Sequence, residues 1–132
     1  MYSGMRSLAI AAALLLVTGC SDDCSDTPIK IVDSPDGLHS AVLFQRDCGA
    51  TTGFSTQVSV VPSRQTPLHA GNAFRADDDH GAAALGPWGG SWAQIQWLAT
   101  DHLLVRYAAK SRIFKRADHV DGVRITYQSI RR

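Results

Sequence analysis

The chain contains no glutamate: all twelve of its acidic residues are aspartate, and ten of its thirteen basic residues are arginine. Glutamate and lysine are better helix formers than aspartate, so this composition favours strands and turns over helices. No segment repeats its apolar residues with a period of 3.6 over ten positions, as an amphipathic helix would. Composition and periodicity therefore both point to a β fold.

An excess of charge of one sign is also missing. The 13 lysines and arginines and the 12 aspartates give a formal net charge of +1, and the balance becomes zero if residues 1–19, which include Arg6, are removed. Binding to nucleic acid depends on a clustered excess of lysine and arginine. We therefore expect no nucleic-acid partner.

A long hydrophobic run is absent as well, because the apolar segment 8–17 has about half of the roughly 20 residues that a transmembrane helix needs. It follows the basic Arg6 and leads through small residues to Cys20, which is the pattern of a secretory signal. Residues 17–20 (Val-Thr-Gly-Cys) resemble the lipobox of bacterial lipoproteins. The resemblance implies cleavage after residue 19 and acylation of Cys20. An ordinary secretory signal that leaves Cys20 as a thiol is the alternative.

The lipobox resemblance also bears on location. Lipoproteins of this kind carry two or three acyl chains, and such anchoring is stable where a single chain binds only marginally. An aspartate directly after the acylated cysteine often retains them at the inner membrane, but here Ser21 follows. In a host with two membranes we expect the outer membrane, with the protein facing the periplasm. Residues 20–27 then form a polar tether, and residues 28–132 are enough for one small domain.

The sequence has three cysteines, Cys20, Cys24 and Cys48, and no Cys-x-x-Cys pair. If Cys20 carries the lipid, we expect the other two to form a disulfide in an oxidising compartment. The bridge would close a loop of about 25 residues and contribute roughly 3 to 4 kcal/mol on the chain-entropy model. A redox-active or nucleophilic Cys48 is the alternative.

Short segments of alternating apolar and polar residues follow one another along the whole domain. Residues 34–37 (Ser-Pro-Asp-Gly) have the order of a type I turn, and segment 38–46 is apolar on both faces, as a central covered strand would be. We predict an all-β fold, a small antiparallel meander of six to eight strands arranged as a sandwich or a half-open barrel. The expected strands are 28–33, 38–46, 55–61, 72–76, 92–98, 103–107, 112–115 and 123–130, the last two paired as a hairpin.

Residues 46–56 (Arg-Asp-Cys-Gly-Ala-Thr-Thr-Gly-Phe-Ser-Thr) are the most distinctive interior stretch. Together with the turn 34–37 and residues 79–81 (Asp-His-Gly), this stretch resembles a family of small bacterial lipoproteins and exported proteins without an assigned activity. The resemblance covers most of residues 28–127. It implies export and a single domain, and it supplies no catalytic residue.

Two stretches are candidates for ligand binding. Asp47, Thr51 and Thr52 could form a polar binding loop, although a disulfide-anchored connection whose hydroxyls satisfy its own backbone is the favoured interpretation of this stretch. Trp88 and Trp92 flank a glycine pair, where exposed indoles could stack on a sugar ring or anchor a partner. The same tryptophans could instead fill the core.

Residues 77–80 (Asp-Asp-Asp-His) are the candidate for a metal site. Carboxylates suit Ca²⁺ or Mg²⁺ and histidine suits transition metals, but four consecutive residues cannot all face one ion without an unusual turn. The ligand spacing of a calcium loop is absent, so we expect a solvated loop, no metal and no cofactor. The five histidines are scattered, and no Ser-His-Asp or paired-carboxylate arrangement follows from their spacing.

These features favour a non-enzymatic, lipid-anchored protein of the cell envelope. The membrane would hold it through the N-terminal lipid, and an envelope protein or the cell wall would be its partner. The alternative is a module that binds a small ligand or glycan through Trp88, Trp92 and the loop 47–52. A hydrolase or thiol enzyme centred on Cys48 or on the loop 77–80 has no supporting motif.

Overall fold

The computed structural model describes residues 24–49 and 53–132, so the signal segment, Cys20, Thr51 and Thr52 lie outside the described residues. Within the described ranges no helix is long and apolar enough to cross a membrane. The same ranges contain nine β-strands: β1 (Ser25–Asp33), β2 (His39–Asp47), β3 (Ser55–Pro62), β4 (Phe74–Asp77), β5 (Ala93–Ala99), β6 (His102–Ala108), β7 (Arg112–Arg116), β8 (His119–Val120) and β9 (Val123–Ile130).

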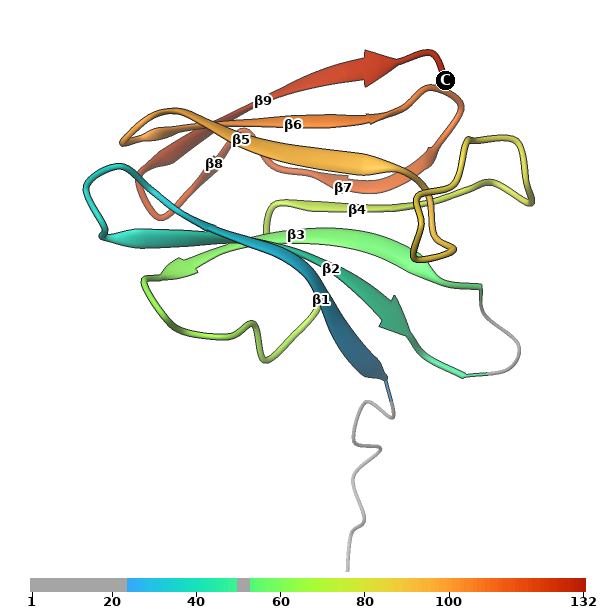
Figure 1. The fold of residues 1–132 in the computed structure, drawn as a ribbon, viewed down its shortest axis with the longest axis horizontal. Helices are drawn as coiled ribbons and strands as arrows, with labels where there is room; N and C mark the ends of the chain where they lie inside the picture. The colour runs from blue at the N-terminus through green and yellow to red at the C-terminus, as the bar shows by residue number, and fades with distance from the viewer. Residues whose placement is uncertain (1–23, 50–52) are drawn as a thin grey trace, which may run out of the picture.

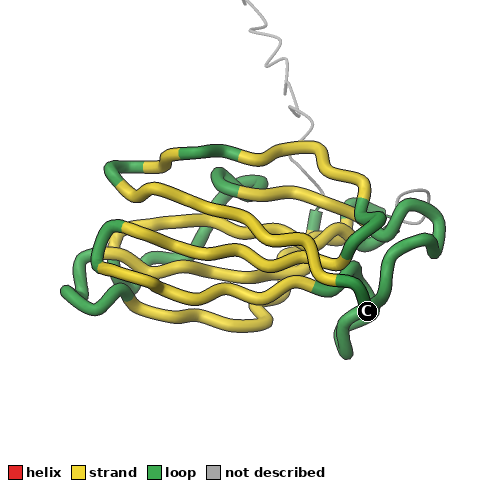
Figure 2. Tube along the Cα trace, turned by 90° about the horizontal axis from the view of Figure 1, so that it is seen from above, coloured by secondary structure: helices red, strands yellow, loops and turns green. Residues whose placement is uncertain are grey.

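The strands form two sheets that lie face to face (Figures 1 and 2). The first sheet has the order β1-β2-β3-β4-β7, and the second has the order β5-β6-β9-β8. All pairs are antiparallel except β6 and β9, which are parallel. The all-β prediction is confirmed, and the two sheets do not close into one barrel. Eight of the strands correspond to the expected segments, and the two-residue β8 is the additional one.

The core lies between the sheets and follows from the alternation of side chains along each strand. In β2, Ala41 and Leu43 point into the core, while Val42 and Phe44 are buried on the other face of the same strand. This double burial confirms the expectation for segment 38–46. The other large residues of the core are Val58, Val60, Phe74, Ile95, Leu103, Val105, Val123 and Ile125.

The predicted hairpin between segments 112–115 and 123–130 is wrong. Strand β7 pairs with β4 in the first sheet, whereas β9 lies in the second sheet between β6 and β8. The turn is tighter than expected: Asp121 and Gly122 both have positive φ (49° and 77°), and Val120 pairs with Val123 across them. Two consecutive residues of positive φ are the mark of a two-residue hairpin turn. The turn therefore joins β9 to β8, and β7 is left to complete the other sheet.

The connection from β3 to β4 folds back over the outer face of the first sheet, where Thr66 and Pro67 lie beside Val42 and Phe44. Asn72 fixes its end, because its side-chain amide accepts a hydrogen bond from the Val60 N–H and donates one to the Val60 carbonyl, each at 2.8 Å. A Cβ atom at Gly71 would lie 2.7 Å from the Phe74 carbonyl oxygen, so glycine is required for this close approach. Strand β4 therefore begins at Phe74 rather than at Asn72. This connection leaves the rest of the outer face open.

Candidate functional site

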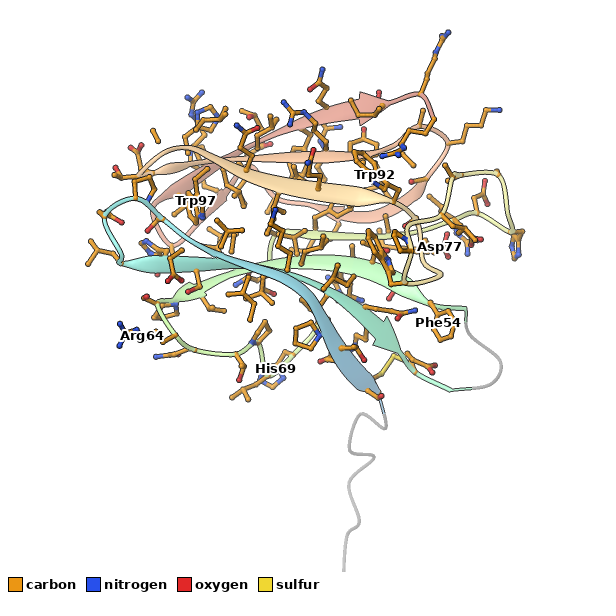
Figure 3. The ribbon with its side chains drawn as sticks, in the orientation of Figure 1. Phe54, Arg64, His69, Asp77, Trp92 and Trp97 are labelled. Carbon is orange, nitrogen blue, oxygen red and sulfur yellow. A yellow bond between two sulfur atoms is a disulfide. The ribbon has the colours of Figure 1, made fainter. Side chains whose placement is uncertain are left out.

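An open groove of about 520 Å³ lies on the outer face of the first sheet, beside the covering connection. Its lining comes from β2, β3, β4, β7 and the segments next to them. Figure 3 shows Asp77 and Phe54 at this end of the sandwich and Arg64 at the opposite end. The lining residues that define its chemistry are Arg46, Cys48, Gln57, Arg75, Asp77 and Arg112, with His80 and Phe114 also in contact with it.

The pleat of β4 places two charged residues in the groove. Phe74 and Ala76 are fully buried in the core, so Arg75 and Asp77, which alternate with them, point to the outer face. The sheet register then sets their neighbours: Arg75 lies between Gln57 of β3 and Lys115 of β7, and Asp77 lies opposite Arg112.

Two of the three arginines in the groove are bound to carboxylates. Arg46, whose side chain is 7% exposed, donates to both carboxylate oxygens of Asp26 at 3.0 and 3.3 Å. Arg112 donates through Nε and Nη2 to the two oxygens of Asp77, and the Asp79 N–H donates to the same carboxylate. Burial would raise the pKa of Asp77, but the hydrogen bonds and positive charge of Arg112 together with the Asp79 N–H outweigh it and lower that pKa. Asp77 is therefore a fixed anion.

Arg75 differs from the other two arginines. Its Nε is buried and has no hydrogen-bond partner, and its guanidinium makes no ion pair with any described residue. The nearest carboxylate on its own strand, Asp77, already binds Arg112. Its partner on β7 is another cation, Lys115. Burying part of a cation without a nearby negative charge lowers the stability of the folded protein.

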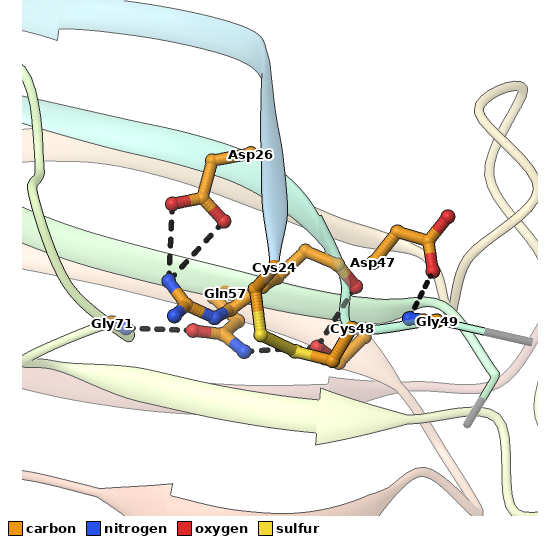
Figure 4. The surroundings of a disulfide bond; sticks show 9 residues. Cys24, Asp26, Asp47, Cys48, Gly49, Gln57 and Gly71 are labelled. Carbon is orange, nitrogen blue, oxygen red and sulfur yellow. Dashed lines mark hydrogen bonds and ion pairs between the residues drawn. A yellow bond between two sulfur atoms is a disulfide. The ribbon is translucent and has the colours of Figure 1, made fainter. Parts of the chain in front are cut away.

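The floor of the groove is fixed by hydrogen bonds and by the disulfide (Figure 4). The Gln57 side chain accepts from the Gly71 N–H at 2.6 Å and donates to the Ser55 hydroxyl at 2.9 Å, so both ends of its amide are used. Cys24 and Cys48 form the predicted disulfide, which ties the start of β1 to the end of β2. Hydrogen bonds and the disulfide thus hold the floor of the groove in place.

Phe114 adds an apolar wall to the charged groove. The residue is 59% exposed, and the Arg112 guanidinium carbon lies 5.1 Å from the centroid of its ring. This contact holds the arginine against the aromatic face and is within the range of a cation–π interaction. The groove can therefore hold an anionic group together with an apolar or ring-shaped part of the same ligand.

Three of the residues predicted as ligand contacts, Asp47, Trp88 and Trp92, are described by the structure and lie outside the groove. Asp47 accepts a hydrogen bond from the Gly49 N–H at 3.0 Å and so stabilises its own turn. The Trp88 indole donates to the Thr56 hydroxyl at 3.2 Å, and its ring packs over Gly86. Trp92 is half-buried with the Arg132 guanidinium 4.4 Å from its ring centroid. Among these described residues none lines the groove.

The loop 77–80 is held by its own contacts. Asp79 and His80 have positive φ (50° and 56°), and Asp77 binds Arg112 as described. In the part of the chain that the structure describes, no three histidine, cysteine or aspartate side chains gather as metal ligands would. Of this loop, Asp77 and His80 line the groove.

The groove was not predicted from the sequence. The alternation along β4 does indicate that Arg75 and Asp77 share a face, but Arg46 and Arg112 are distant in the sequence and meet them only through the sheet order. No protein-family model matches the chain, and no curated protein or solved structure matches it either. The chemistry of the groove is therefore the basis for proposing a function.

Proposed function

We propose that this chain is a lipid-anchored protein of the bacterial envelope that acts by binding, and that the groove is its binding surface. The observation that carries the proposal is the unpartnered Arg75 guanidinium in an open groove of about 520 Å³. The lipobox resemblance at Cys20 supports the anchor and an outer-membrane position that faces the periplasm. The partner is an envelope component, a ligand or a wall fragment that reaches the groove.

Two features of the groove favour binding over catalysis. The Cys48 sulfur is bonded to Cys24 and is not a thiol nucleophile. Asp77 is a weak base, because the groups around it lower its pKa and occupy its oxygens. A general base works best when its pKa lies near the operating pH. The fixed charges of the groove suit the recognition of a ligand better than proton transfer.

Photo-crosslinking in intact cells tests this proposal. A photoreactive phenylalanine replaces Phe114, which lies in the groove, or Leu38, which is 65% exposed in the β1–β2 turn at the far end of the sheet. We expect capture of an envelope component from position 114 and not from position 38. Equal capture at both positions, or no capture at position 114, would contradict the proposed binding surface.

A further inference from the structure

We propose that the groove binds a phosphate group, and that Arg75 is the residue that binds it directly. This inference rests on the proposed function and specifies the chemistry of its ligand. The groove presents a positive site of the right kind: a guanidinium offers parallel N–H donors in a planar fork that matches the oxygens of a phosphate.

The charge balance of the groove identifies Arg75. Asp26 binds Arg46 and Asp77 binds Arg112, so each of these carboxylates is already engaged by another arginine. Arg75 keeps a whole positive charge with a buried Nε, and Lys115 lies opposite it in the sheet register. An anion placed against the outer N–H groups of the Arg75 guanidinium would accept hydrogen bonds from them and neutralise this repulsion. A ligand with two or more oxygens and a negative charge fits that requirement.

The surroundings of Arg75 suit an oxyanion with several oxygens, such as phosphate. Arg112 stands near the same space with its guanidinium already oriented by Asp77, and it can take part of the charge of a phosphate without moving. Gln57 beneath the site is held by Gly71 and Ser55, so the floor does not need to reorganise on binding. Preorganised donors of this kind improve affinity because little ordering remains to be done.

The tether places this site close to a source of phosphate. Cys48 lines the groove and is bonded to Cys24, which is four positions after Cys20 in the sequence. A fully extended segment of four residues reaches about 14 Å. With the lipid on Cys20, the groove therefore stands next to the headgroup layer of the membrane. A lipid headgroup and free phosphate present the same chemistry to Arg75.

The test is calorimetric titration of the full chain in a phosphate-free nonionic detergent at constant ionic strength. One arm adds inorganic phosphate. The other adds mixed micelles that contain phosphatidylglycerol, with an uncharged galactolipid as the phosphate-free reference. The variants are R75Q, the conservative R75K, and R64Q, which removes the same charge from an exposed residue at the far end of the sheet.

We expect the native chain and R64Q to bind phosphate equally, and R75Q to bind about tenfold or more weakly, because charge-assisted hydrogen bonds are lost. R75K keeps the positive charge but loses the planar fork of N–H donors. Its affinity for phosphate should therefore lie between those of the native chain and R75Q. Binding in the micelle arm alone, with the same dependence on Arg75, supports the inference and identifies the headgroup as the source.

Absence of binding in both arms, or binding that R75Q and R64Q weaken equally, overturns the inference. Its failure is distinguishable from that of the proposed function. If position 114 still captures an envelope component while phosphate does not bind, the binding surface stands and the phosphate assignment falls. The thermal midpoint of each variant without ligand confirms that it is folded.

Discussion

Arg75 is the residue on which the account of the groove depends most. A buried polar atom without a partner usually marks a place where the fold gives up stability, and such places are frequent at functional sites. The Arg75 Nε is one of three buried side-chain atoms without a hydrogen-bond partner in the described ranges, and it is the one that lines the groove. This arrangement makes a prediction about stability that is separate from any ligand.

Replacing Arg75 with glutamine should stabilise the ligand-free protein. The change removes an unpaired cation that faces Lys115 across the sheet, and like charges opposite each other cost about 0.2 to 1 kcal/mol. We expect the free energy of unfolding of R75Q to rise by about that amount in urea denaturation. The control R64Q should change it by less than about 0.5 kcal/mol. A loss of 1 kcal/mol or more in R75Q would mean that Arg75 has a structural role instead.

Single residues also show how far the sequence alone can lead. The turn 34–37 forms as its sequence predicts, with the Gly37 N–H donating to the Ser34 carbonyl at 2.8 Å. The hydrogen bond from the Ser34 hydroxyl, followed by that from the Leu38 N–H, lowers the pKa of Asp36. The hydrogen bonds of this turn can be predicted from the sequence because every partner lies within a few residues. Arg75 could not be recognised in this way, because its lack of a partner depends on how β3, β4 and β7 pair.

Among the elements, Tyr127 of β9 connects the two sheets. Its hydroxyl donates towards the carbonyl oxygens of Ala117 and Ala73, at 2.6 and 3.0 Å, and both acceptors belong to segments of the first sheet. Its ring also packs against Phe74, with the ring centroids 5.9 Å apart. These contacts hold β9 against the end of β7, where the predicted hairpin would have placed a turn.

Replacing Tyr127 with phenylalanine should lower the free energy of unfolding by about 1 to 2 kcal/mol, since the Ala117 carbonyl loses its hydroxyl donor, whereas the Ala73 carbonyl keeps the Ala117 N–H. The pH dependence gives a second readout. Burial, with a smaller contribution from Asp118, raises the pKa of Tyr127 to about 12 against the opposing effect of Arg116. A raised pKa means that this group stabilises the fold below pH 10 and that the contribution is lost as the pH rises towards 12.

Urea denaturation between pH 9 and 12 measures this effect. We expect the stability of the native chain to fall over that interval by more than the stability of Y127F does. Parallel curves for the two proteins would show that the Tyr127 hydroxyl is not protected in the folded state.

The disulfide is the second feature at the scale of elements. It joins residues 24 apart in the sequence and fixes the first strand beside the groove. Replacing both Cys24 and Cys48 with serine should cost about 3 to 4 kcal/mol in the free energy of unfolding. Comparison of the native chain with and without reductant, by thermal denaturation, provides the control. An unchanged midpoint would mean that the bridge adds no stability.

The elements were more predictable than their pairing. The alternation of apolar and polar residues predicted eight strands to within a few positions. It does so because successive side chains of a strand point to opposite faces of the sheet, which gives the sequence a period of two. The pairing of β7 with β4, and of β9 with β6, joins segments that are distant along the chain. Segments 112–115 and 123–130 alternate in a similar way and are close in the sequence, so alternation alone predicts that they pair as a hairpin. Only the packing of both sheets decides which strands they pair with.

In the whole molecule, the Cys24–Cys48 disulfide lies beside the groove, so the proposed anchor at Cys20 would hold the groove end of the domain towards the membrane. The account requires acylation of Cys20, which lies outside the described residues. The variant C20A should lose incorporation of labelled palmitate and leave the membrane fraction, while the thermal midpoint of the domain stays the same. Retained label in C20A would contradict the lipobox interpretation.

The residue after the anchor makes a separate prediction about location. In a host with two membranes, Ser21→Asp should move the protein from the outer to the inner membrane in a sucrose-gradient separation, with palmitate incorporation unchanged. A native chain found at the inner membrane would contradict the proposed outer-membrane position.

Photo-crosslinking in living cells tests the groove and its unpartnered arginine together. The photoreactive residue at position 114 is introduced into the native chain, into R75Q and into R64Q, and the captured envelope component is quantified at equal protein levels. The account predicts strong capture by the native chain and by R64Q, and a loss of about tenfold in R75Q, matching the loss of charge-assisted hydrogen bonds. Equal capture in all three chains would contradict it.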